Sequence, residues 1–356
     1  MTLAFLIVLA LILAGGGPVA QPVLLNFIFY VIFTPLIATA IIFAGSLFVN
    51  FAQSANMIMR GEGILKKAML ITGTGAVLNI ILDPIMITAM SAQGKGIEGA
   101  AYATVVSQIV TAAITLWYFL TKSKVVRIHR VRLESSLISE ILGVGFSAML
   151  MQVMTMVQQT TLYHVAARHG GDTWQIILGA ALSIQSFTMI PLWGAGQGFQ
   201  PAAGTNYGAK QYDRVKQVTR AFMVGVTVLS PIFYIPIQLA PKTILSWFIK
   251  DAGIVSQGVA DFRILFSTYI LLGFVLMVIT LMQSLGKASK ASVLVMMRQI
   301  ILFVPLAILL PQIGGLGAHG VFLAPAVTDL IILILAIVLL TGEFRNISKL
   351  ATQEQR

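Results

Sequence analysis

The sequence predicts an all-α, polytopic membrane protein, and three observations lead to that fold class. The chain has 356 residues, of which 58% are hydrophobic and only 10% are charged, whereas a soluble domain carries about 25% charged residues. The apolar residues gather in long runs, and most Lys and Arg residues lie in the segments between them. So few charges cannot cover a water-exposed surface, and so apolar a chain is not disordered. A soluble enzyme is therefore excluded, and the absence of cysteine excludes disulfides and thiolate metal sites.

Ten apolar runs are candidate membrane spans, because a helix needs about 20 apolar residues to cross a bilayer. The first run is too short to cross, since it stops at Gly15-Gly16-Gly17-Pro18 after about 14 residues. A signal peptide is the alternative for this run, but no basic residue precedes it and no polar domain follows it. The ten runs are 1–14, 20–57, 64–90, 97–121, 137–167, 173–205, 213–240, 260–285, 287–311 and 318–341.

The positive charges predict the orientation of the chain in a prokaryotic plasma membrane. Seventeen of the 23 Lys and Arg residues fall in alternate segments between the runs, at 60–67, 122–132, 210–220, 287–290 and 345–356. The positive-inside rule places this richer side in the cytoplasm. Ten spans then put both termini in the cytoplasm. The net charge of +11 thus reflects topology, and we expect a lipid environment and no nucleic-acid partner.

An internal repeat predicts two lobes. The segment from Arg60 reads RGEGILKKAML and the one from Ser284 reads SLGKASKASVL, and Gly-rich turns follow both after one further span. The offset is 221–223 residues throughout, and both copies run in the same direction across the membrane. Such repeats are common in secondary transporters, with the site at their interface. Because the second copy starts near residue 137, we expect ten visible helices of a twelve-helix, 6+6 architecture that lacks two N-terminal helices. A genuine ten-helix protein with unequal halves is the alternative.

The repeat also predicts the domain boundaries. They are an N-terminal lobe remnant of about four helices (1–121), a cytoplasmic inter-lobe loop (122–136), a six-helix C-terminal lobe (137–345) and a cytoplasmic tail (346–356).

Asn79 and Asp83 form the first candidate site. They are four residues apart within the span 64–90 and therefore share a helix face. An ionisable residue at this depth is costly, so it indicates function. Pro84 frees a backbone carbonyl in the preceding turn, and carboxylate, amide and hydroxyl oxygens suit Na⁺ or a proton. A structural hydrogen-bond hub at Asp83 is the alternative.

Arg298 and Asp329 are predicted to pair. Each lies near the middle of its span, and the two spans are antiparallel with a short turn between them. Either charge alone would be expensive in the membrane. A static structural pair and an element of ion coupling both remain open.

A polar stripe predicts a substrate cavity in the span 137–167. Its members follow the helical spacing i, i+3, i+7 and i+11, and the next span adds three glutamines. Such stripes either line aqueous cavities or join helices by hydrogen bonds, and the sequence does not decide between the two. The residues are Gln152, Thr155, Gln159 and Tyr163, with Gln185, Gln197 and Gln200. None of the four histidines has metal-ligand spacing, so no cofactor and no metal besides a coupling Na⁺ at Asp83 is expected.

Two segments together resemble the MATE (multidrug and toxic compound extrusion) transporters. One is Gly194–Val215, with its QP, GxNYGAK and RV elements, and the other runs from Arg60 through Asn79-Ile-Ile-Leu-Asp83-Pro84 to Gly99-Ala-Ala-Tyr-Ala-Thr104. The resemblance covers essentially the whole chain and implies twelve helices in two six-helix lobes. It also implies export of organic, often cationic compounds by a monomeric antiporter that uses a Na⁺ or H⁺ gradient, and no enzymatic activity.

The resemblance further implies a cation site at Asn79, Asp83 and Thr104. The family's additional Asp on the first helix has no counterpart here, nor does the acidic residue that some members carry near the position of Thr155. Two other functions stay open: a flippase for lipid-linked precursors, which would favour a strongly cationic cavity, and a fragment without transport activity.

Overall fold

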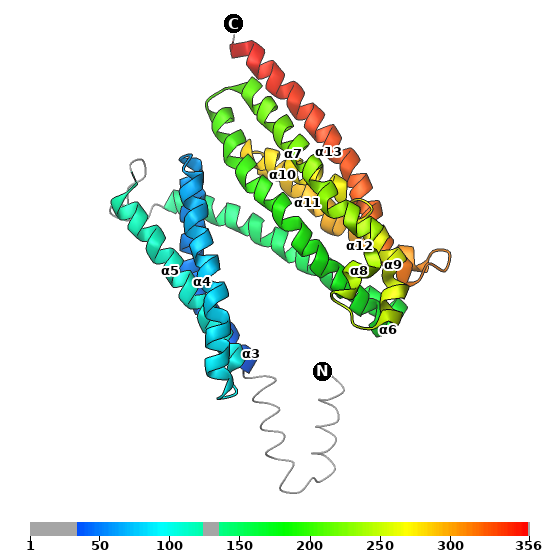
Figure 1. The fold of residues 1–356 in the computed structure, drawn as a ribbon. Coiled ribbons are helices and arrows are strands. Elements are labelled where there is room, and N and C mark those ends of the chain that lie inside the picture. Colours follow the sequence, from blue (N-terminus) through cyan, green and yellow to red (C-terminus); the bar gives the residue numbers. More distant parts are fainter. Residues whose placement is uncertain (1–33, 124–134, 355–356) are drawn as a thin grey trace. The chain divides into compact units, whose positions relative to one another are not determined.

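The computed structural model describes residues 34–123 and 135–354, and the chain divides into two compact units at residues 131 and 132 (Figure 1). Every regular element in the described residues is a helix. Eight helical stretches among the described residues are long and apolar enough to cross a membrane. The all-α, membrane-spanning fold class is therefore confirmed. The predicted run 1–14 and the first part of the run 20–57 lie outside the described residues.

The N-terminal unit contains three membrane helices, α3 (Thr34–Gly61), α4 (Leu65–Ser91) and α5 (Gly96–Thr121). Helix α5 packs against both α3 and α4. The turn between α3 and α4 uses Gly63 at φ 77°, a conformation that costs glycine little. Helix α4 continues through Pro84, so the proline neither ends the span nor separates Asn79 from Asp83.

The C-terminal unit contains the remaining elements, in which α8 and the short turns connect longer helices (Figure 1). In chain order they are α6 (Ser135–Gly208), α7 (Tyr212–Leu239), α8 (Pro241–Ser246), α9 (Ala252–Phe266), α10 (Tyr269–Ser284), α11 (Ala288–Met296), a π segment (Met297–Ile301), α12 (Phe303–Leu309), a 3₁₀ turn (Leu310–Gln312) and α13 (Ala318–Glu354).

The long element α6 is two helices that meet at Gly171, whose φ of 65° and ψ of −159° are not helical. The chain folds back at this glycine. The two helices are in contact beyond it, since Gln175 Nε2 donates to the backbone oxygen of Tyr163 over 3.3 Å. These two helices correspond to the predicted spans 137–167 and 173–205.

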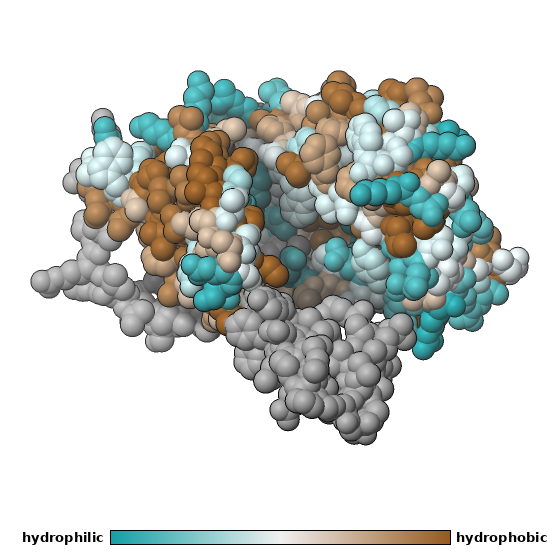
Figure 2. Space-filling view, turned by 60° about the horizontal axis from the view of Figure 1, so that its bottom comes forward, coloured by the Kyte–Doolittle hydropathy of each residue, from teal (hydrophilic) through white to brown (hydrophobic). Residues whose placement is uncertain are grey.

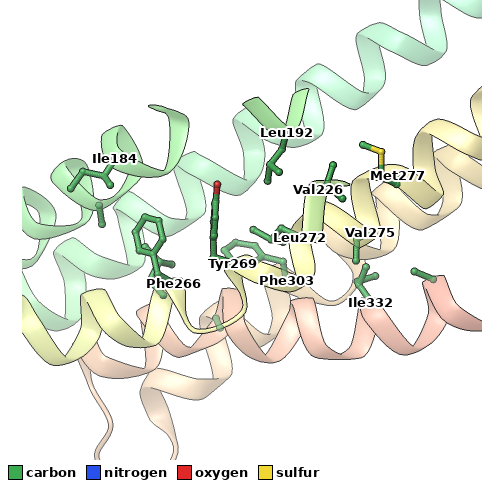
Figure 3. Packing of buried hydrophobic residues seen from close by; sticks show 14 of the residues in the cluster. Ile184, Leu192, Val226, Phe266, Tyr269, Leu272, Val275, Met277, Phe303 and Ile332 are labelled. Carbon is green, nitrogen blue, oxygen red and sulfur yellow. The ribbon is translucent and has the colours of Figure 1, made fainter. Parts of the chain in front are cut away.

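Helix α10 lies at the centre of the C-terminal unit and contacts α6, α7, α11 and α13. Tyr269, Met277 and Val278 on α10 are 1% exposed or less (Figure 3). The Tyr269 hydroxyl points towards α6 and donates to the backbone oxygen of Thr188 over 2.7 Å. This bond satisfies the one polar group on a ring that is otherwise buried among apolar side chains.

The surface of the other helices carries many apolar side chains (Figure 2). Phe43 is 78% exposed, Leu47 77% and Leu239 76%. A soluble protein rarely exposes contiguous apolar surface on this scale. In a bilayer these side chains contact lipid, which agrees with the long apolar runs of the sequence.

Two predicted spans are interrupted. The span 260–285 breaks at Ser267 and Thr268, between α9 and α10, and the span 287–311 contains the π segment Met297–Ile301. A π turn adds one residue to a helix and often occurs at functional sites. The periodicity of the apolar residues does not reveal either interruption, because both flanks are uniformly hydrophobic.

Gly320 on α13 offers a stability prediction. A Cβ there would lie 2.5 Å from the backbone nitrogen of Pro311, whereas a Cβ on Gly342 of the same helix would meet nothing within 4 Å. We expect Gly320→Ala to lower stability by about 1–3 kcal/mol, because the backbone must shift. Gly342→Ala is the matched control and should be neutral or stabilising. Thermal unfolding in detergent measures both, and equal midpoints would contradict the prediction.

Candidate transport site

Asn79 and Asp83 face one another on α4. Asn79 Nδ2 donates to Asp83 Oδ1 over 3.1 Å, and both residues are half-buried. The hydrogen bond holds Oδ1 of the carboxylate on the helix face that also carries Asn79. Next to this pair, the Thr88 hydroxyl donates to the backbone oxygen of Pro84. The two residues that the sequence placed on one face thus lie within hydrogen-bond distance of one another.

A polar cavity of about 270 Å³ lies between α3, α4 and α5. Asn79 and Thr104, two of the three predicted cation-site residues, line it, whereas Asp83 does not. Nine of the fourteen lining residues are polar, and none is charged. They are Gln53, Asn56, Thr72, Asn79, Thr104, Ser107, Gln108, Thr111 and Thr115.

Seven of these polar lining residues are absent from the sequence prediction. A signal for them was present, because Thr104, Ser107, Thr111 and Thr115 follow the spacing i, i+3, i+7 and i+11 within α5. This is the same spacing that singled out the stripe at Gln152. Small hydroxyl side chains are common in membrane helices, so the spacing alone does not separate a cavity wall from ordinary packing.

Arg298 and Asp329 form the predicted ion pair. Arg298 Nε lies 2.8 Å from Asp329 Oδ1, and the Thr268 hydroxyl donates to Asp329 Oδ2 over 3.2 Å. Asp329 is 4% exposed, so both oxygens of a buried carboxylate have partners. The pair joins the π segment to α13, and Thr268 belongs to the break between α9 and α10. The two helical interruptions therefore meet at one carboxylate.

The predicted substrate-cavity residues are divided. Gln159 and Tyr163 line a cavity of about 480 Å³ on the first half of α6. Thr155 instead accepts a hydrogen bond from Gln299 Nε2 of the π segment over 2.9 Å. Gln152, Gln185, Gln197 and Gln200 line neither this cavity nor the cavity in the N-terminal unit. Both interpretations of the stripe thus apply, since one end joins helices and the other faces open space.

A further cavity, of about 550 Å³, adjoins the previous one and shares Met156, Thr160 and His164 with it. Arg168 and His169 also line it, and no carboxylate does. The sequence predicts no metal site at these histidines, because their spacing does not suit a metal.

Two further buried acids pair with basic residues in the C-terminal unit. Asp261 on α9 is fully buried, and its Oδ1 lies 2.7 Å from Nδ1 of His319 on α13. Glu343, which is 2% exposed, pairs with Lys287 and Lys290. Both pairs link elements that are distant in the sequence, and for this reason no local sequence motif predicts them. No group of three or more potential metal ligands occurs in the described residues.

Comparison with known proteins identifies several relatives. The FAD transporter of Shewanella oneidensis is 24% identical over 282 residues, which cover 78% of this chain and 61% of that protein. The multidrug export protein MepA of Staphylococcus saprophyticus is 23% identical over 242 residues, covering 67% of this chain and 52% of MepA. The probable multidrug resistance protein YoeA of Bacillus subtilis is 26% identical over 212 residues, covering 58% and 45%. The chain thus spans about half to three fifths of the length of these curated relatives.

Solved structures share the fold. A MATE structure in complex with MaL6 has a TM-score of 0.81 at 24% identity and covers 88% of this chain and 70% of that one. An outward-facing multidrug resistance MATE transporter also has a TM-score of 0.81, at 22% identity, and covers 92% and 77%. In addition, residues 144–309 match the MatE family model. The matched residues and the shared fold therefore make this chain similar to the MATE family of membrane transporters.

Proposed function

We propose that this chain exports small organic compounds across a prokaryotic plasma membrane in exchange for Na⁺ or H⁺. The observation that carries the proposal is the Asn79–Asp83 pair, a carboxylate held half-buried in a membrane helix by an amide 3.1 Å away. The match of residues 144–309 to the MatE family model supports it, as do the two relatives named for multidrug export and resistance.

In the proposed mechanism, Asp83 binds the coupling cation that enters from outside. Binding neutralises a carboxylate that is expensive to leave charged in the membrane. Neutralisation changes the balance between outward-facing and inward-facing states, and substrate leaves on the outer side, which is alternating access. Both termini and the basic loops lie on the cytoplasmic side in this scheme. The repeat-derived boundaries at 121 and 137 remain our proposal for the lobes, and the transporter acts as a monomer.

An export assay tests the proposal. The purified chain is reconstituted into vesicles loaded with ethidium, and the vesicles are diluted into buffer with high Na⁺ or with low pH outside. We expect ethidium to leave faster under at least one of the two gradients, and a Na⁺ ionophore or a protonophore to abolish the difference. Release that is equal with and without both gradients would overturn the proposal.

A second candidate substrate class is anionic. The 550 Å³ cavity contains Arg168, His164 and His169 and no carboxylate, and one relative is named an FAD transporter. A basic lining attracts phosphate groups and repels organic cations. The same vesicles loaded with FAD distinguish the two classes, because gradient-driven release of FAD without release of ethidium would favour the anionic class.

A further inference from the structure

We propose that Asp261 and His319 form a proton-binding site at the end of the C-terminal unit where α6 turns at Gly171, and that a bound proton holds α9 and α13 together there (Figure 1). The site goes beyond the proposed function, because it belongs to a different unit from the Asn79–Asp83 pair and binds no substrate. The proposed orientation places this end on the outer side of the membrane, so the proton comes from the external solution.

The carboxylate of Asp261 is the group that needs a proton. Asp261 is fully buried, and its Oδ2 has no hydrogen-bond partner in the described residues. Its Oδ1 lies 2.7 Å from Nδ1 of His319, which is the only ion pair that Asp261 forms among those residues. A buried carboxylate is costly unless a positive charge or a proton compensates it. The compensation must therefore come through His319.

The imidazole of His319 connects this buried carboxylate to solvent. The side chain of His319 is 54% exposed, whereas that of Asp261 is 0% exposed. His319 is the second residue of α13 and follows the turn at Gly317. Because Nδ1 faces the carboxylate, a further proton reaches the pair at Nε2, the other nitrogen of the ring.

Proton binding removes the net charge of the pair. Without the additional proton, a neutral imidazole donates its Nδ1 proton to Oδ1, and the buried negative charge remains. A hydronium ion then transfers its proton to Nε2, which forms one N–H bond and leaves water. The product is an imidazolium next to a carboxylate, and their opposite charges attract strongly where little water surrounds them. The two groups titrate as a unit, and the proton strengthens the link between α9 and α13.

Three helices meet at this pair, so a change in its charge acts on all of them. The ring of His319 contacts Trp174 of α6 at an angle of 78°, with 5.1 Å between the ring centroids. On α9, a Cβ at Gly258 would lie 2.7 Å from Cγ2 of Ile177 on α6, so these two helices pack closely here. Trp174 stands three residues after Gly171, which links the pair to the turn of α6.

The other charged and histidine side chains near this end of the unit are exposed. Helix α9 packs against α6, α7, α8 and α13, and water screens exposed charges on these elements from the pair. Asp329, further along α13, is engaged by Arg298 and Thr268. The tyrosines of α6 and α7 ordinarily titrate at about pH 10, above the range of a carboxylate and an imidazole. The exposed residues are His164, Arg168, His169 and Asp172 on α6, Lys242 on α8, and Lys250, Asp251 and Arg263 at α9.

Trp174 can report the charge on His319, since an imidazolium at the edge of an indole quenches its fluorescence. The chain has four tryptophans, and the other three, Trp117, Trp193 and Trp247, are exposed and can be replaced by phenylalanine. The experiment places this single-tryptophan form of the full chain in lipid nanodiscs. It measures the emission of Trp174 between about pH 4 and 9, which includes the ordinary titration ranges of Asp and His.

We expect one step, in which the emission falls as the pH is lowered. His319→Gln should abolish the step, because glutamine keeps a polar side chain there but binds no proton. Asp261→Asn should weaken proton binding about tenfold or more, since it removes the opposite charge next to the imidazole. His169→Gln and Asp172→Asn remove exposed titratable groups close to the α6 turn. These two variants are the matched controls and should keep the step.

A second measurement does not depend on Trp174. The chain has four histidines, so ¹⁵N NMR of the histidine-labelled chain gives few resonances, and the one that disappears in His319→Gln belongs to His319. Its ring nitrogens should titrate with the same midpoint as the fluorescence. Thermal unfolding of each variant verifies that it is folded.

The outcomes separate this inference from the proposed function. An emission that does not change with pH, or the same step in His319→Gln, would overturn the proton site. An unchanged midpoint in Asp261→Asn would also overturn it, because His319 would then titrate alone. Neither measurement involves export. If the step behaves as expected while the vesicles show no gradient-driven release of ethidium, the proton site stands and the proposed function fails.

Discussion

Asp83→Asn is expected to remove gradient-driven export while the chain still folds. Asparagine keeps the shape of the side chain, and its Oδ1 can still accept the hydrogen bond that Asn79 Nδ2 donates over 3.1 Å. It cannot change charge, so cation binding no longer alters the balance between the two access states. We expect the gradient-driven rate to fall by about 5- to 150-fold, the usual size of coupling between two sites.

The vesicle assay with ethidium measures this effect, and thermal unfolding of the same preparation verifies the fold. Asp172→Asn is the control, because it removes an exposed carboxylate at the turn of α6 without touching α4. A normal export rate in Asp83→Asn would assign Asp83 a structural role, as the alternative interpretation of the sequence holds.

Arg298→Gln is expected to destabilise the C-terminal unit strongly. It leaves Asp329, which is 4% exposed, with the Thr268 hydroxyl and no compensating charge. Removing one partner of a buried ion pair costs about 3–5 kcal/mol. The π segment also loses its 2.8 Å link to α13 through this carboxylate. We expect a lower unfolding midpoint in detergent and reduced accumulation in membranes.

The double variant Arg298→Gln/Asp329→Asn distinguishes a structural pair from a coupling element. Two neutral amides can hydrogen bond without an unpaired charge, so most of the stability should return. We expect export to return with it, as a structural clamp requires. A double variant that is stable but does not export would instead make the pair part of the coupling mechanism, and a single variant as stable as the unmodified chain would refute both interpretations.

The sequence predicted the membrane helices. It also predicted those side-chain pairs whose members lie on one helix or on two consecutive helices. Asn79 and Asp83 are four residues apart, and Arg298 and Asp329 lie on consecutive antiparallel helices, so spacing and the cost of buried charge were sufficient. Asp261 and His319 are 58 residues apart and meet through the packing of α9 on α13. No periodic pattern contains that information.

The cavity in the N-terminal unit was missed for a different reason. Its wall consists of neutral residues from three helices, and hydroxyls that bond to their own helix backbone look like ordinary packing in a sequence. What makes them a wall is Gly75, whose missing side chain leaves room for the Thr111 hydroxyl. In the stripe at Gln152 the opposite happened, because helical spacing grouped two residues with different surroundings. Thr155 accepts a hydrogen bond from Gln299, whereas Gln159 lines a cavity.

The π segment sets the rotational phase of everything that follows it up to Gln312. One additional residue turns the rest of a helix by about 100° relative to an uninterrupted α-helix of 3.6 residues per turn. Without the additional residue, Phe303 and Ala307, which are fully buried, would face a different direction. The segment Met297–Ile301 therefore changes the helical phase by one residue. Arg298 within it pairs with Asp329, and the residues that follow keep their apolar face towards the core.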